Sequence, residues 1–230
     1  MNNAASFPSE YQQAMGRLLV LYTQVDRLIM QVCAQRLPAA PDETTELALA
    51  KQIGDESRHV SIQRAWMRDF GADPAPIITP EQEQMIREHF QSLPWVDFLA
   101  DLYVCVEALG SEAVERIVPL ADPGTRESLR IPLTDELDHV AFGLTQLKKE
   151  LARMPVTERQ NFLRRLPARI ASLTEAFHGF GIPARAMFEA VGADYDRLCL
   201  LLEERQKELI SELTRASSSS ITVAQSAMTV

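Results

Sequence analysis

Apolar residues along the chain recur every three or four positions, and this interval predicts helices. The first long stretch shows it at Leu18, Tyr22, Val25, Ile29 and Val32. Side chains at such intervals share one face of a helix, whereas a half-buried strand would alternate apolar and polar positions. No such alternation is present in the sequence. The pattern therefore predicts an all-α protein.

Prolines and glycines divide this pattern into successive helices, because proline cannot continue the hydrogen-bond ladder and glycine commonly follows a helix end. The predicted helices are 9–37, 44–70, 80–91, 95–118, one from the turn at 122–124 to residue 154, 157–177 and 184–215. Thr44 or Thr45 is the expected cap of the second helix, and Thr157 that of the helix ending at 177. Pro132 is expected to kink or split its helix, and Pro167 to interrupt the next one.

The length and the distribution of apolar residues predict one domain with a short tail. A chain of 230 residues is long enough to bury a sizeable core as one unit. We expect residues 1–216 to form a single helical domain. The segment 217–230 opens with serines and has no helical periodicity, so we expect a flexible C-terminal tail.

A five-residue pattern, Asp-Glu-x-x-His, occurs twice inside predicted helices. Residues three positions apart share a helix face, so Glu56 points the same way as His59, and Glu136 the same way as His139. A carboxylate and an imidazole from each of two helices form the inward-facing set that holds two metal ions in a helical bundle. If the pattern occurred only once, a charged helical turn that faces solvent would be the simpler explanation. Two of the chain's four histidines nevertheless fall at the same place in the same pattern, which favours a metal site.

Such a site also needs one carboxylate from each of two further helices. Glu107 lies in the most apolar part of its helix with no basic residue one turn away, and Asp26 has similarly apolar neighbours on the first helix. A buried, unpaired carboxylate is costly unless a cation accompanies it. Four carboxylates also balance the charge of two divalent ions. We therefore expect Glu56, Glu107 and Glu136 to be the catalytic carboxylates, in a metal-ligand set comprising Asp26, Glu56, His59, Glu107, Glu136 and His139.

Charged residues next to these ligands are expected to orient them. A metal-bound histidine usually donates its other ring N–H to a carboxylate or a carbonyl. Asp55 and Asp135 each precede a predicted glutamate ligand, and we expect each to reach the histidine of the facing helix. Arg58 is expected to hold one of these aspartates. His89 and His178 fit no such pattern and are expected to be surface or core residues.

Composition narrows the classes of partner. The formal net charge of −9 argues against nucleic acid and against an anionic membrane surface. No apolar run approaches the roughly 20 residues that cross a bilayer, and residues 1–8 have no secretory signal pattern. The three cysteines are isolated in apolar helical contexts, which favours reduced thiols. These features predict a cytoplasmic protein.

Two runs follow Glu107 along the chain, Val-Pro-Leu-Ala-Asp at 118–122 and Asp-Glu-x-x-His-x-x-Phe-Gly at 135–143. The residues of these two motifs and the spacing between them resemble those of the ferritin-like di-iron oxygenases, and most closely those of the aldehyde-deformylating oxygenases. The Asp-Glu-x-Arg-His form at 55–59 is similar to that of bacterial multicomponent monooxygenases and of the phenylacetyl-CoA epoxidase catalytic subunit. The resemblance covers about 26–147.

This resemblance implies a ferritin-like four-helix bundle with additional C-terminal helices. It implies two iron ions (Fe2+/Fe3+), held by the six ligands named above, that activate O2 to oxidise a small or apolar organic substrate. An external electron donor, a ferredoxin or a reductase, is implied as well. Manganese or a mixed Mn/Fe pair is compatible with the same residues. The chain departs from the family at Asp26, where the deformylating enzymes have glutamate, and has Gln63 where ribonucleotide reductase small subunits have a radical tyrosine.

Helical spacing places Tyr22, Tyr103, Val104 and Phe142 near the predicted ligands, so they are candidates for lining a substrate cavity, although plain core packing is the ordinary role of such residues. Two other functions fit the same sequence. One is a ferroxidase or iron-handling ferritin-like protein, which a very large assembly would favour; a monomer or homodimer would favour the oxygenase. The other is a non-catalytic helical interaction protein in which the repeated pattern is accidental.

Overall fold

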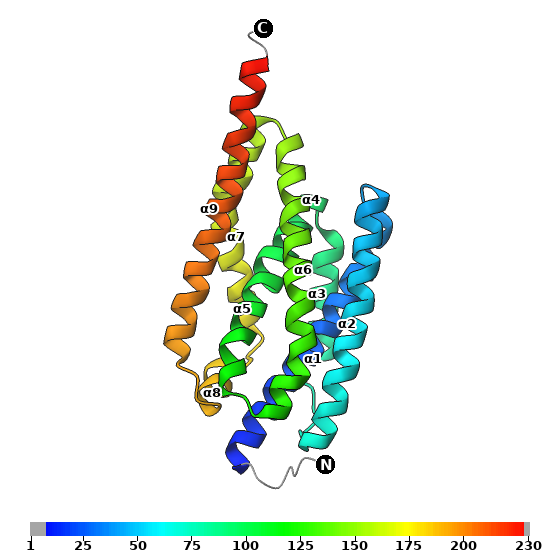
Figure 1. The fold of residues 1–230 in the computed structure, drawn as a ribbon, viewed down its shortest axis with the longest axis vertical. Helices are drawn as coiled ribbons and strands as arrows, with labels where there is room; N and C mark the ends of the chain where they lie inside the picture. The colour runs from blue at the N-terminus through cyan, green and yellow to red at the C-terminus, as the bar shows by residue number, and fades with distance from the viewer. Residues whose placement is uncertain (1–7, 228–230) are drawn as a thin grey trace.

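The computed structural model describes residues 8–227, with side chains through residue 215, and all regular secondary structure in this part of the chain is helical. The long helices run roughly along one axis; α1 begins at one end of that axis and α9 ends at the other (Figure 1). The all-α prediction is thus confirmed. Within the described part of the chain, no helix combines the length and the apolar character that crossing a bilayer requires.

The first two long helices are α1 (Ser9–Arg36) and α2 (Glu43–Phe70), which pack against each other. A short 3-10 turn at Leu37–Ala39 follows α1. The cap of α2 is Asp42 rather than a threonine, because the Asp42 side chain accepts a hydrogen bond from the Thr45 backbone N–H at 2.8 Å. Gly71 ends α2 in the left-handed conformation, with φ of 77°, as its position predicted.

The third predicted long helix is not a continuous α-helix. After α3 (Pro80–Ser92), the chain forms α4 (Trp95–Leu99), a π-helical segment (Ala100–Glu107), and α5 (Ala108–Ile117). The Ala108 backbone N–H donates to the Tyr103 carbonyl, five residues back, where an α-helix would use the residue four back. This π segment carries Glu107, and π segments often lie at functional sites.

The helix α6 (Pro123–Arg153) contains Pro132 without being split, which corrects one alternative of the prediction. A proline removes one backbone hydrogen bond from a helix, and here Pro132 is buried among the neighbouring helices, where packing offsets that loss. The next helix, α7 (Val156–Gly179), likewise continues through Pro167. Pro155, with no side-chain hydrogen bond, precedes α7, so the expected cap at Thr157 is wrong.

The last predicted helix is divided in two, α8 (Ala184–Ala190) and α9 (Tyr195–Ala227). Gly192 lies between them with φ of 90°, a conformation that glycine adopts without strain. The expected start of a tail at residue 217 is not a boundary of secondary structure, because α9 extends to Ala227; residues 228–230 lie outside the described residues.

The helices form a bundle in which those that carry the predicted ligands are neighbours. Helix α2 packs against α1 and α6, and α6 packs against the π segment. Helix α7 also packs against the π segment, and α9 packs against α5 and α6. Helix α6 and the π segment approach closely at Gly143, where an added Cβ atom would lie 1.9 Å from Tyr103 Cγ. Only glycine fits at this contact, which sets how near α6 comes to Glu107.

Candidate metal centre

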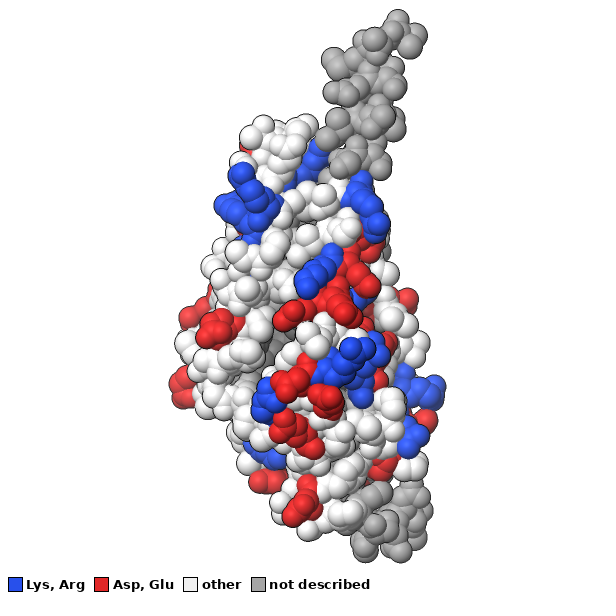
Figure 2. Space-filling model, turned by 90° about the vertical axis from the view of Figure 1, so that its left-hand side faces the viewer, with Lys and Arg blue, Asp and Glu red and all other residues white. Residues whose placement is uncertain are grey.

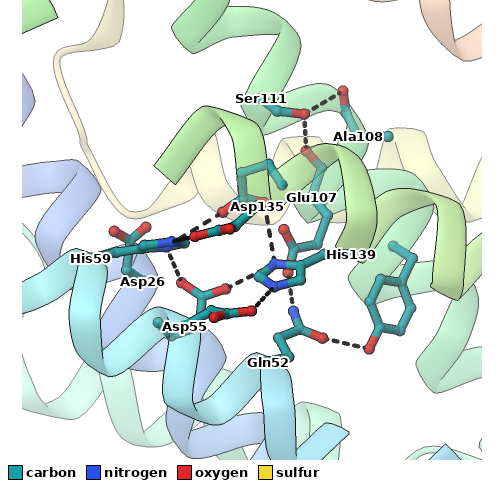
Figure 3. Close-up of polar contacts among 12 residues, drawn as sticks. Asp26, Gln52, Asp55, His59, Glu107, Ala108, Ser111, Asp135 and His139 are labelled. Carbon is teal, nitrogen blue, oxygen red and sulfur yellow. Dashed lines mark hydrogen bonds and ion pairs between the residues drawn. The ribbon is translucent and has the colours of Figure 1, made fainter. Parts of the chain in front are cut away.

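The structure brings all six predicted ligands together in the interior of the bundle. Their ligand atoms form two groups, and within each group these atoms lie within 4.8 Å of one another. One group is Asp26, Glu56 and His59; the other is Glu56, Glu107, Glu136 and His139. Glu56 belongs to both groups, so its carboxylate could contact a cation held by either one. Figure 3 shows the side chains converging from separate helices.

The two histidines approach the shared Glu56 from opposite sides. His59 Nδ1 lies 3.2 Å from Glu56 Oε2, and His139 Nδ1 lies 3.3 Å from Glu56 Oε1. Glu136 is within 3.9 Å of Nδ1 on both rings. Glu56 and His59 are 0% exposed, so α2 directs both side chains fully inward. Each imidazole therefore presents Nδ1 to the carboxylates of Glu56 and Glu136.

The other ring nitrogen of each histidine contacts an aspartate from the opposite copy of the pattern. His59 Nε2 lies 2.9 Å from Asp135 Oδ2, and His139 Nε2 lies 3.2 Å from Asp55 Oδ2 (Figure 3). Arg58 donates to Asp55 at 3.1 Å and also to Asp135. A carboxylate that accepts the Nε2–H leaves the Nδ1 lone pair available for a metal. The predicted contacts of these aspartates and of the arginine are thus present.

Burial opposes ionisation of both aspartates, but their partners outweigh it. Hydrogen bonds and charge from Lys51 and His139 lower the pKa of Asp55, and those from His59 and Arg58 lower the pKa of Asp135. Both carboxyl groups are therefore ionised acceptors at neutral pH, as the orientation of a histidine ligand requires.

Two glutamine side chains hold the remaining carboxylates, and the sequence analysis missed this role for both. Gln52 donates to Glu107 Oε1 at 2.5 Å and accepts from the Tyr103 hydroxyl at 2.7 Å. Gln63 donates to Asp26 Oδ2 at 2.8 Å. Gln52 lies four residues before Glu56, and Gln63 four residues after His59, so both share the ligand face of α2. A glutamine four residues from a predicted ligand on the same helix is the sequence feature that could have indicated this role.

Several ligand atoms are buried with no hydrogen-bond partner. They are Glu56 Oε1, Glu107 Oε2 and His139 Nδ1; the 3.3 Å contact between Glu56 Oε1 and His139 Nδ1 does not have the geometry of a hydrogen bond. Buried polar atoms are nearly always hydrogen-bonded, and each unpaired one costs free energy. These three atoms come from three helices and face the same point, so cations between them would satisfy all three. The donor set of carboxylates and imidazole fits divalent first-row transition metals.

The electrostatics of the group favour positive charge among the carboxylates. Burial and the charges of Glu56 and Glu136 raise the pKa of Asp26 and of Glu107 well above the usual range. Burial by itself lowers the pKa of His139, but its close contacts with the carboxylates of Glu136 and Glu56 raise it to about 10. Without metal, protons therefore neutralise this cluster of carboxylates, and two divalent cations would replace them.

A cavity of about 550 Å³ adjoins the carboxylates Asp26, Glu107 and Glu136. Residues of α1, α3, the π segment, α5 and α6 line it, and so do residues of α7, α8 and α9, for which the sequence suggested no role. Tyr22 lines this cavity as expected. The expected lining residues Tyr103, Val104 and Phe142 do not, because they pack in the core; the rings of Tyr103 and Phe142 meet edge to face at 5.7 Å.

The two remaining histidines lie away from the ligands. His89 is partly exposed, and its Nε2 lies 2.8 Å from Asp101 Oδ2, on the side of the π segment that Arg169 also contacts. His178 is exposed on α7 and borders the cavity. Both are thus surface residues, within what the sequence predicted for them.

No protein-family model matches the sequence, and a comparison with curated proteins finds no match. The function is therefore inferred from the site and from the cavity beside it.

Proposed function

We propose that this protein is a di-iron enzyme of the ferritin-like type that uses O2 to oxidise an organic substrate. The observation that carries the proposal is the pair of ligand groups that share Glu56 and contain three unpaired buried ligand atoms. This is the ligand arrangement of di-metal carboxylate bundles, with a Glu-x-x-His pair on each of two helices. Bound iron would supply the reduction of O2 and the oxidation of the substrate.

The residues of the chain have separate tasks in this proposal. Asp26 and His59 would hold one ion, and Glu107 and His139 would hold the other; Glu56 belongs to both groups, and Glu136 lies beside both histidines. Asp55 and Asp135 fix the histidine rings by accepting their Nε2 protons. The apolar wall of the cavity excludes water and places a substrate against the carboxylates.

The cavity favours an oxygenase over a protein that only oxidises or stores iron. In an iron-handling protein the metal is itself the substrate, and an apolar space of about 550 Å³ beside the ligands has no use there. Electrons come from outside the chain in this proposal, so a ferredoxin or a reductase is its partner. A monomer or a dimer in solution fits the oxygenase, whereas a very large assembly would favour iron storage.

Anaerobic loading with Fe(II), followed by metal analysis and mixing with O2, tests the proposal. We expect two iron ions per chain and an absorbance transient on mixing with O2. Glu136→Ala and His139→Ala should abolish metal binding, and His89→Ala, at a surface histidine away from the ligands, should retain it. Binding of less than about one iron ion per chain after loading would contradict the metal site and support a non-catalytic helical protein.

A further inference from the structure

A buried carboxylate at the start of the π segment is held by two other helices. Asp101 is 1% exposed and lies six residues before Glu107 in the same segment. Arg169 of α7 donates to both of its oxygens, through Nε to Oδ1 and through Nη2 to Oδ2 at 2.8 Å. Nε2 of His89, on α3, lies 2.8 Å from the same Oδ2. A buried carboxylate needs such partners, because an unpaired one is costly.

Arg169 holds a second carboxylate of the same helical stretch. Its Nη1 donates to Oδ1 of Asp97 at 2.9 Å, and Asp97 lies in α4, one turn before Asp101. The two carboxylates lie on either side of the point where α4 ends, at Leu99, and the π segment begins, at Ala100. A planar guanidinium that binds carboxylates through several N–H groups fixes their direction as well as their distance. Helix α7 thus fixes the rotation of the chain where the π segment starts.

The other end of the π segment is fixed at the metal centre. Glu107 belongs to the ligand group around His139, and Gln52 donates to it at 2.5 Å. A π turn has one residue more than an α-helical turn, and each residue of an α-helix rotates the chain by about 100°. A change from π to α would therefore rotate one end of the segment by about 100° relative to the other. Asp101 could not then reach Arg169 while Glu107 points at the metal centre.

Ion pairs on the surface do not constrain the chain in this way. Figure 2 shows acidic and basic side chains interspersed on the α9 side of the molecule. On α8, Arg185 lies 3.0 Å from Glu189, and the side chains of both residues are half exposed. Water screens such a pair and leaves its side chains free to move, so the pair contributes little. The contact of Arg169 with Asp101 differs because this carboxylate has almost no access to water.

We propose that Arg169 is a positioning residue of the metal centre: it holds Asp101 in the rotation that keeps the segment π-helical and so directs Glu107 toward the other ligands. The inference rests on the proposed function, because it concerns the cation position that Glu107 helps to form. It gives α7 a part in building the metal centre, although α7 supplies none of the six ligands. Without the contact, the segment should relax to an α-helix, turn Glu107 away and lose one of the two cation positions.

Removing Arg169 alone is an unsuitable test, because Asp101 would stay buried without its main partner and the fold itself could fail. The double variant Asp101→Leu, Arg169→Met avoids this, since apolar residues of similar size can replace a buried ion pair with little loss of stability. Urea denaturation checks that its stability matches that of the native chain. Zinc takes the same carboxylate and imidazole ligands without redox chemistry, so metal analysis after zinc loading counts the cation positions.

We expect two zinc ions per native chain and one per chain of the double variant. Two ions in a double variant of native stability would mean that Arg169 only stabilises the fold, and would overturn the inference. His89→Ala removes the other partner of Asp101 but leaves the guanidinium in place, so it should retain two ions. Arg185→Met removes an arginine that contacts only residues of α8 and α9, and it should retain two as well. Loss of an ion in either control would contradict the assignment to Arg169.

A crystal structure of the metal-free double variant shows the hydrogen-bond pattern without any need for metal binding. In the native chain the Ala108 N–H donates to the Tyr103 carbonyl, five residues back. In the variant we expect it to donate to the Val104 carbonyl, four residues back, with Glu107 turned away from the other ligands. An unchanged π segment with Glu107 in place would reject this inference alone. A native chain that binds less than about one zinc ion would reject the proposed function, whereas the altered helix in the variant would still show that Arg169 holds the segment.

Discussion

Asp135 accepts a hydrogen bond from His59 Nε2 at 2.9 Å, although the two residues are 76 positions apart and belong to different copies of the same pattern. The reciprocal pair, Asp55 and His139, lies at 3.2 Å. Each copy thus supplies the carboxylate that orients the histidine of the other. The site is assembled only when α2 and α6 pack together, so metal affinity and bundle packing should depend on each other.

Asp135→Asn should lower metal affinity by about 10- to 100-fold, because the amide has the shape of the carboxylate but neither its charge nor its strength as an acceptor. A chelator competition titration measures this. The matched control is Asp138→Asn, an exposed aspartate one turn along the same helix, which should change affinity little. Equal losses in both variants would mean that net charge, and not the orientation of His59, sets the affinity.

Gly143→Ala should destabilise the protein by about 1–3 kcal/mol, because the added methyl group collides with the Tyr103 ring. The same collision should disturb Glu107, which Tyr103 reaches through Gln52. Gly54→Ala is the control, since a Cβ there has nothing within 4 Å and lies within α2. That substitution should raise the free energy of unfolding by about 0.5–1 kcal/mol. Urea denaturation distinguishes the two, and a Gly143→Ala protein as stable as the native one would refute the contact.

The sequence predicted which carboxylates and histidines come together better than it predicted the helices that hold them. Glu56 and His59 were readable because a three-residue spacing fixes a shared helix face, whatever the rest of the fold does. The π segment that carries Glu107 could not be predicted, because a single extra residue per turn leaves the apolar run unchanged. Gly192 does not mark a helix end in the sequence, because a glycine inside a helical pattern is often tolerated; its φ of 90° in the structure shows the break.

The residues that line the cavity could not all be predicted from local sequence patterns, because the lining depends on tertiary packing. Tyr22 lines it and Tyr103 does not, although both lie one turn before a predicted ligand. The difference arises because Tyr103 faces Gly143 of α6, where the absent side chain leaves room for its ring. Such a pairing joins residues 40 positions apart and is fixed by tertiary packing, not by helical periodicity.

Metal affinity should rise with pH between about pH 6 and 8. The pKa values of Asp26 and Glu107 are raised by burial and by neighbouring carboxylates, and that of His139 is raised to about 10, so the metal-free site holds protons that a cation must displace. Below these pKa values the proton competes with the metal; above them it does not. Calorimetry in two buffers of different ionisation enthalpy measures the protons released on binding. An affinity that is independent of pH over this range would contradict the arrangement.

One of the three thiols should react much faster than the others with a thiol reagent at pH 8. Burial raises the pKa of Cys105 to about 12, and burial together with the charges of Glu56 and Glu136 raises that of Cys33 well above the usual value, so both stay protonated and unreactive. Cys199 is partly exposed at the cavity, and it should supply the fast phase. Cys199→Ser should remove that phase. A fast phase that survives in Cys199→Ser would mean that the bundle around Cys33 or Cys105 opens readily, and labelling could then no longer report on the cavity.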